Sequence, residues 1–218
     1  MNLKINLRQI EQSFERIANE LMNEYAIKVR ETYYRIVDCE FYFTHELHND
    51  VYTHGHEEQS KTGSWYFHGS GIDITIGNKE TGSKGGILLR GIAKISDKQN
   101  ANGDCIEVNK KTIGPLNVLT TLFSHFENIF DKDNSFYLVR KQEIGILNFI
   151  ETRILKLPRI GLNIQRNKED YFEKLYRFIS FPYLPHAEKG KAEKYLIDNK
   201  TLTHSEAKEL FTLKYNPV

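Results

Sequence analysis

The chain has 218 residues, of which 39% are hydrophobic and 12% are aromatic. This length and composition suit one globular domain with a sizeable core, and they exclude overall disorder. The formal net charge of +1 excludes a global polycation. Charge by itself therefore neither supports nor excludes a nucleic-acid partner.

The two cysteines, Cys39 and Cys105, form no C-x-x-C motif and are too few for a disulfide framework. The first residues lack the uninterrupted apolar run of a signal peptide, and no stretch reaches the length that spans a membrane. We therefore expect a cytoplasmic protein, in a reducing compartment of bacterial type, with no membrane partner.

Apolar residues at helical spacing predict an amphipathic helix near the N-terminus, formed by Ile10, Phe14, Ile17 and Leu21. Two strands are expected next, at about 25–30 and 33–43. Side chains alternate between the faces of a strand, so the second strand has two chemically different faces. One face is apolar and holds Val37, Cys39, Phe41 and Phe43. The other holds Asp38, Glu40 and Tyr42, and carboxylates beside an aromatic ring favour a pocket there.

A polar loop at 44–64 carries four histidines, namely His45, His48, His54 and His56. Long ordered loops are often functional, and four imidazoles are enough ligands for zinc or another transition metal. The H-x-x-H spacing differs from the helical H-E-x-x-H motif of zinc enzymes, so we assign no metal ligand. A metal-dependent hydrolase that uses this loop stays open as an alternative.

The remaining elements are predicted in chain order from apolar runs and turn residues. Strands are expected at 65–67 and 72–76, where Ile72, Ile74 and Ile76 lie opposite Asp73 and Thr75. A glycine-rich hairpin tip at 77–86 leads to a return strand at 87–92, and Gly114-Pro115 opens a helix. Short strands are expected at 158–162 and 175–180. Helices are expected at 189–198 and 204–213, the second with a capping box formed by Thr203 and Glu206.

Ordered blocks over roughly residues 10–185 resemble the alkyladenine (3-methyladenine, or methylpurine) DNA glycosylase family. Residues 36–42 resemble its I-V-E-T-E-A-Y strand, and Asp50-x-x-x-His54 resembles its D-x-x-x-H. Trp65-x-x-His68-Gly69 falls at its Y-x-x-Y-G, and residues 88–91 fall at its L-[IL]-R-A. Later blocks are Gly114-Pro115, the P-R-I-G of residues 158–161, and residues 176–183, which resemble W-R-F-Y-x-x-x-P-x-V.

The resemblance implies an α+β fold. We expect a single domain with a mixed or antiparallel, curved, barrel-like β-sheet and flanking helices. Residues 1–185 would form the glycosylase-like domain. Residues 186–218 would form a C-terminal helical extension packed on the same domain. We expect a monomer.

The resemblance also implies a DNA repair activity. Members of the family hydrolyse the N-glycosidic bond of alkylated or deaminated purines in double-stranded DNA after flipping the damaged nucleotide into a pocket. An alkylated purine carries positive charge and is a good leaving group. The enzyme needs a stacking slot for the ring and a base that activates water, and no cofactor is implied.

By resemblance, Glu40 occupies the position of the catalytic carboxylate, and Arg90 would hold it ionised and help place the water. The aromatic rings expected around the flipped base are Tyr42, His54 and Trp65. His68 falls at the position of the residue that intercalates into DNA. The residue that discriminates among purines falls at Asp73 or Thr75, depending on the register, and Asp would accept hydrogen bonds where Asn can also donate.

The chain departs from the family pattern in two further places. The loop between Tyr42 and His54 is three residues longer than in the family. The family's basic segment R-T-x-R-N-x-x-M-F has no match in residues 59–64. A non-catalytic or altered-substrate member of the same fold is therefore the second alternative.

Overall fold

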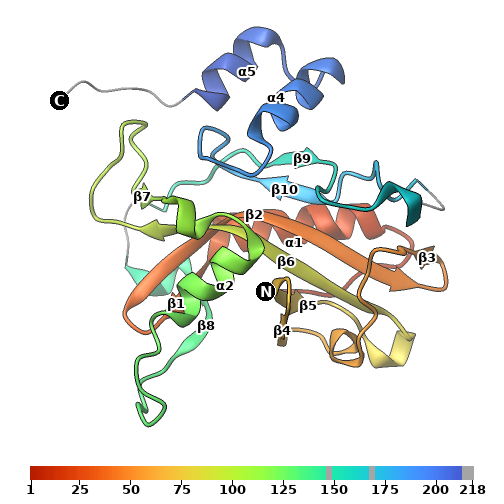
Figure 1. The fold of residues 1–218 in the computed structure, drawn as a ribbon, viewed down its shortest axis with the longest axis horizontal. Coiled ribbons are helices and arrows are strands. Elements are labelled where there is room, and N and C mark those ends of the chain that lie inside the picture. Colours follow the sequence, from red (N-terminus) through yellow and green to blue (C-terminus); the bar gives the residue numbers. More distant parts are fainter. Residues whose placement is uncertain (146–148, 167–169, 213–218) are drawn as a thin grey trace.

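The computed structural model describes residues 1–145, 149–166 and 170–212, and the structural statements below concern those residues. A curled antiparallel sheet runs through the chain in the order β4-β5-β6-β2-β1-β8, and β10 pairs with both β2 and β9 (Figure 1). The strands are β1 (Tyr25–Val29), β2 (Thr32–His45), β3 (His48–Asn49), β4 (Trp65–His68), β5 (Gly71–Thr75), β6 (Lys84–Ile95), β7 (Ile106–Glu107), β8 (Phe136–Arg140), β9 (Leu155–Leu157) and β10 (Arg177–Ile179).

Helices flank the sheet, as Figure 1 shows. They are α1 (Ile10–Glu24), α2 (Pro115–Phe123), α3 (Lys141–Ile144), α4 (Lys189–Asp198) and α5 (His204–Phe211), with short 3-10 helices that include η1 (Glu57–Ser60). The expected α+β class with a curved sheet and flanking helices is therefore confirmed. No helix in the described ranges is long and apolar enough to cross a membrane.

Most of the predicted elements are confirmed, and one is misplaced. The expected strand at 158–162 is wrong, because the strand in this region is β9, which ends at Leu157. Pro158 follows it directly, and proline has no N–H to donate to a sheet ladder. The predicted capping box of α5 is present, with the side chains of Thr203 and Glu206 each bonded to the other residue's backbone N–H. The last residue of the helix predicted at 204–213 lies outside the described residues.

The long strand β2 is the centre of the sheet and contains a bulge. Its register with β6 shifts between Ile36 and Asp38 and again between Asp38 and Cys39. Because a bulge inserts an extra residue, the residues before it lie on the opposite face from the one that strict alternation predicts. Ile36 and Cys39 therefore both enter the main core, whereas Val37 packs in a separate cluster. The expectation that Val37 shares a face with Cys39 is wrong.

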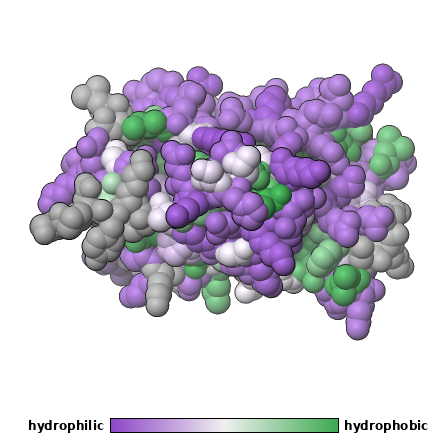
Figure 2. Space-filling model, turned by 90° about the horizontal axis from the view of Figure 1, so that it is seen from above, coloured by the Kyte–Doolittle hydropathy of each residue, from purple (hydrophilic) through white to green (hydrophobic). Residues whose placement is uncertain are grey.

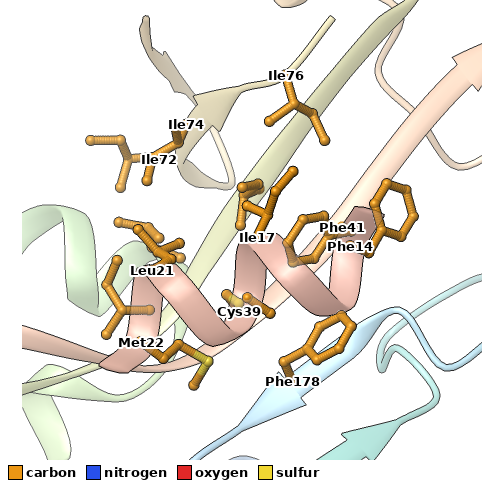
Figure 3. Packing of buried hydrophobic residues seen from close by; sticks show 14 of the residues in the cluster. Phe14, Ile17, Leu21, Met22, Cys39, Phe41, Ile72, Ile74, Ile76 and Phe178 are labelled. Carbon is orange, nitrogen blue, oxygen red and sulfur yellow. The ribbon is translucent and has the colours of Figure 1, made fainter. Parts of the chain in front are cut away.

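The main core lies between α1 and the sheet (Figure 3). The apolar stripe of α1 meets side chains of β2, β5 and β10; the labelled members are Phe14, Ile17, Leu21, Met22, Cys39, Phe41, Ile72, Ile74, Ile76 and Phe178. Nearly all of these side chains are fully buried, and each buried large apolar side chain contributes about 1.5–3 kcal/mol to stability. One face of β2, β5 and β6 packs on this core, and their other face carries the polar side chains Glu40 and Asp73 as well as the smaller apolar cluster that contains Val37.

The C-terminal helices pack on the sheet edge formed by β9 and β10. A second apolar cluster joins Leu155, Leu157 and Ile179 to side chains of α4 and α5. Seen from the side on which these helices lie, the surface is mostly hydrophilic, with hydrophobic residues only in separate small areas (Figure 2). The extension is thus anchored on the same domain by apolar contacts.

Candidate functional site

Glu40 lies in the middle of β2 and points to the face opposite the main core. Its side chain has 0% exposure, and its carboxylate is held by neighbouring donors. Tyr42 Oη donates to Oε2 at 2.6 Å, and Arg90 Nη1 donates to the same oxygen at 3.2 Å. The backbone N–H of Ile160 donates to Oε1 at 2.9 Å. Burial and the Glu40 charge raise the pKa of Tyr42 well above its usual value, so Tyr42 stays a donor.

The loop that supplies the Ile160 N–H is fixed by a buried ion pair. Arg159 Nη1 and Nη2 donate to the two carboxylate oxygens of Asp50 at 2.6 and 3.0 Å, and both side chains have 0% exposure. Arg159 also donates to the carbonyl oxygens of Phe41 and Tyr171 at 3.0 and 3.1 Å. Its guanidinium lies 4.5 Å from the centre of the Tyr42 ring, within the range of a cation–π contact. Two sequence blocks far apart along the chain thus meet beside Glu40.

A group of aromatic rings lies on β4 and the preceding loop. Tyr66 stacks on His68 with ring centres 5.1 Å apart, and His56 stacks on Tyr66 with ring centres 5.2 Å apart. His54 contacts His68 at 5.2 Å, edge to face. These four residues, which we call the ring cluster, offer flat π-faces beside a polar sheet surface.

The strand register places Glu40 and the ring cluster on one face of the sheet. Glu40 lies opposite Leu88, Leu88 lies opposite Asp73, and Asp73 lies opposite Tyr66. Residues directly opposite each other in antiparallel strands project to the same side. The row therefore runs from a carboxylate through Leu88 to a second carboxylate and an aromatic ring.

Asp73 is the second carboxylate of this row and is 3% exposed. His68 Nε2 lies 3.0 Å from its Oδ1, and Gln59 Nε2 donates to its Oδ2 at 3.1 Å. A Cβ atom at Gly86 would lie 2.4 Å from Oδ2. The Asp73 carboxylate therefore occupies space that exists only because residue 86 is glycine.

Three of the residues expected from the sequence are placed differently. Trp65 points away from Glu40 and packs beside the main core, where its ring centre lies 4.4 Å from that of Phe136. Tyr66, and not Trp65, therefore lies on the polar face on which the stacking ring is expected. The reason is alternation, which puts neighbours on opposite faces. His68 is bonded to Asp73 and its side chain is 10% exposed, so it is not a projecting wedge. Thr75 is bonded through Oγ1 to the Ser64 backbone, which gives it a structural contact.

The four loop histidines do not gather at one point, although His54 and His56 both belong to the ring cluster. His45 lies at the hairpin between β2 and β3, where its Nδ1 accepts from the Leu47 N–H, and His48 contacts Tyr171. His56 caps η1, and His54 joins the ring cluster. Within the described residues, no group of three or more His, Cys, Asp or Glu side chains gathers in a way that could hold a metal ion. The metal-dependent alternative therefore has no site in this part of the chain.

Sequence reasoning missed four contributors to the site, namely Arg159, the Ile160 N–H, Tyr66 and Gln59. The resemblance alone marks the P-R-I-G block that holds Arg159, and it gives Asp50 no chemical role. Arg159 is the one charged residue in the P-R-I-G block, and its charge is opposite to that of Asp50, so the sequence offers this pair as a possible contact. Nothing in the sequence marks a backbone N–H or the contact of Gln59 with Asp73.

Chemically, the arrangement offers a buried carboxylate and, three strands away on the same face of the sheet, a group of stacked rings. Among the described residues Oε1 of Glu40 accepts one hydrogen bond, which leaves a lone pair for the proton of a water molecule. Arg90 supplies a positive charge next to the carboxylate, and its side chain is 12% exposed. A planar, electron-poor ligand suits the ring cluster.

Comparisons with known proteins identify a distant relative, and this relative has no described activity. No family model matches the chain. The chain is similar to L759, an uncharacterized protein of Acanthamoeba polyphaga mimivirus, with 27% identity over 188 residues. The match covers 70% of this chain and 80% of the viral protein. The viral protein is described only as uncharacterized, so function is argued from the site itself.

Proposed function

We propose that this protein is a monofunctional N-glycosylase that removes damaged purines from double-stranded DNA in the cytoplasm. The observation that carries the proposal is the buried Glu40 carboxylate, which is held by Arg90, Tyr42 and the Ile160 N–H on the same sheet face as a cluster of aromatic rings. The resemblance of the ordered sequence blocks to methylpurine DNA glycosylases supports it independently.

In the proposed reaction Glu40 acts as the general base. A water molecule on Oε1 gives one proton to Glu40 while its oxygen forms a bond to the C1′ carbon of the deoxyribose. The C1′–N bond breaks, and its electron pair passes to the purine. An alkylated purine already carries positive charge, so it leaves as a neutral base without a proton donor. The products are the free base and an abasic site.

The neighbours of Glu40 have separate roles in this reaction. Arg90 Nη1 lies 3.2 Å from the carboxylate and would help to place the water molecule. Tyr42 and the Ile160 N–H fix its direction. Tyr66 and His54 would stack on the flipped base, and DNA is the partner that presents it.

Excision from a synthetic duplex that contains a single damaged purine tests the proposal. Wild-type protein is compared with Glu40→Gln, which removes the base and keeps the shape, and with Glu46→Gln as a matched control in the exposed turn after β2. Loss of a general base lowers the rate by about 10²–10⁴-fold. We expect such a loss for Glu40→Gln and no change for the control.

Two results would contradict the proposal. Equal excision by wild type and Glu40→Gln would refute the role of Glu40. A gel-shift at low salt with a duplex that carries an abasic-site mimic separates an enzyme from a protein with no DNA function, because phosphate contacts are strongest at low salt. Absence of both excision and binding would favour the non-catalytic alternative.

A further inference from the structure

A cavity of about 140 Å³ lies between helix α4, the strands β9 and β10 and the loop that follows β9. Figure 1 shows α4 beside these two strands, in the C-terminal extension, which has no part in the proposed reaction. The apolar walls of the cavity come from Leu157, Ile160, Ala192 and Tyr195. An apolar cavity of about 150 Å³ holds one benzene molecule, so this cavity has room for a ligand with a single ring.

Arg159 lines the cavity with a guanidinium group that has one donor left. The group has five N–H bonds, two each at Nη1 and Nη2 and one at Nε. The four at Nη1 and Nη2 are used by Asp50 and by the carbonyl oxygens of Phe41 and Tyr171. The fifth, at Nε, is buried and has no hydrogen-bond partner among the described residues. A buried donor without a partner is costly, and a ligand acceptor removes that cost.

A second buried guanidinium group lines the same cavity and is held in a similar way. Arg177 donates to Asp38 through Nε and Nη2, and it donates to the Ala187 carbonyl oxygen through Nη2. Within the described ranges its Nη1 makes no hydrogen bond. Its side chain is almost fully buried. Two arginines, each fixed by a carboxylate, thus border one small space and have N–H donors to spare.

The exposed rim of the cavity is also basic. Lys191 lines the cavity from the first turn of α4, and the N-terminal end of a helix carries partial positive charge. The N-cap residue Glu188 makes no capping hydrogen bond with its side chain. It pairs instead with Lys191 at 3.0 Å, and both of these side chains are exposed. An exposed pair is weak, so a ligand anion can replace Glu188 at low cost.

We propose that this cavity binds a small molecule that carries a terminal phosphate group on a single apolar ring. Phosphate presents three strong acceptor oxygens, which match the spare donors of Arg159, Arg177 and Lys191. Asp50 and Asp38 balance the charges of the two arginines, so Lys191 and the positive end of α4 supply the net attraction. A phosphate within a DNA strand carries chain on both sides and would not reach two buried arginines. The inference does not depend on the proposed glycosylase activity.

Isothermal titration calorimetry of the full chain at constant ionic strength tests the proposal. The probes are phenyl phosphate, inorganic phosphate and benzyl alcohol, which has the ring without the anion. We expect phenyl phosphate to bind about 10-fold more tightly than inorganic phosphate, because its ring contacts the apolar walls. Benzyl alcohol should bind at least about 10-fold more weakly than phenyl phosphate, because it leaves the charged donors unpaired.

Charge reversal on α4 tests whether the anion binds in this cavity. Lys191→Glu and its matched control Lys194→Glu change the net charge equally, and both lysines are exposed on the same helix. Lys191 lines the cavity, whereas Lys194 is not among the lining residues. We expect Lys191→Glu to weaken phenyl phosphate binding at least about 10-fold. Lys194→Glu should change it by less than about 2-fold, because salt screens a more distant charge.

Each outcome decides for or against the site. Weaker binding by Lys191→Glu with unchanged binding by Lys194→Glu supports it. Equal losses in both variants, equal binding of benzyl alcohol and phenyl phosphate, or no binding of the two phosphate probes overturns it. Displacement of phenyl phosphate by an undamaged DNA duplex would assign the anion to a DNA backbone and would also overturn it. Excision at Glu40 is measured separately, so the proposed glycosylase stands or falls by its own test.

Discussion

Replacing Asp50 by alanine should destabilise the protein strongly, because it leaves the Arg159 charge buried. Both side chains have 0% exposure, and the pair is joined by hydrogen bonds of 2.6 and 3.0 Å. Each hydrogen bond to a charged group contributes about 1.5–3 kcal/mol, so two amount to about 3–6 kcal/mol. Arg159 keeps two backbone carbonyl acceptors, which offset part of the loss. We expect about 3–5 kcal/mol, the usual cost of breaking a buried pair.

Urea denaturation followed by circular dichroism at pH 7 measures this change as the free energy of unfolding. Asp50→Asn keeps an oxygen acceptor without the charge, so its loss should be intermediate. The control is Glu15→Ala, which removes a pair with Lys156 at 2.7 Å in which both side chains are nearly half exposed. Exposed pairs contribute about 0–1 kcal/mol. If Asp50→Ala costs no more than the control, the reasoning about the buried pair is refuted.

Three other predictions concern buried groups. Burial raises the pKa of Asp38, but the Arg177 guanidinium outweighs burial and holds this pKa well below 3.8. The pair therefore contributes its full stability above about pH 4, and this stability is lost as the pH falls below that value. Asp38→Asn should flatten the fall in unfolding free energy between about pH 4 and pH 2, measured in urea, and an unchanged slope would contradict this assignment. Cys39 and Cys105 are 0% and 4% exposed, and burial raises the pKa of Cys39. Neither thiol should therefore react with a thiol reagent until denaturant is added. Rapid labelling of the native protein would contradict this prediction. Phe41→Ala should cost about 3–5 kcal/mol in the same urea assay, since Phe41 is fully buried, and a loss below about 1 kcal/mol would mean the site collapses around the smaller side chain.

Local patterns predicted the elements because their causes are local. The helical spacing of Phe14, Ile17 and Leu21 and the alternation around Ile72 and Asp73 depend only on near neighbours along the chain. The capping residues of α5 likewise act within one turn. The bulge at Asp38 could not be predicted, because it is defined by pairing with a strand about fifty residues away.

The sequence by itself determined that Glu40, Tyr42 and Asp73 leave the core for a polar face, since period-two alternation sets the side on which each side chain lies. Only the tertiary structure decided what meets them there. Arg159 and Gln59 come from distant segments, and the ring cluster contains Tyr66 in place of the expected Trp65. Which distant groups meet depends on strand register and loop path. These are fixed by the packing of the whole sheet, which no local pattern encodes.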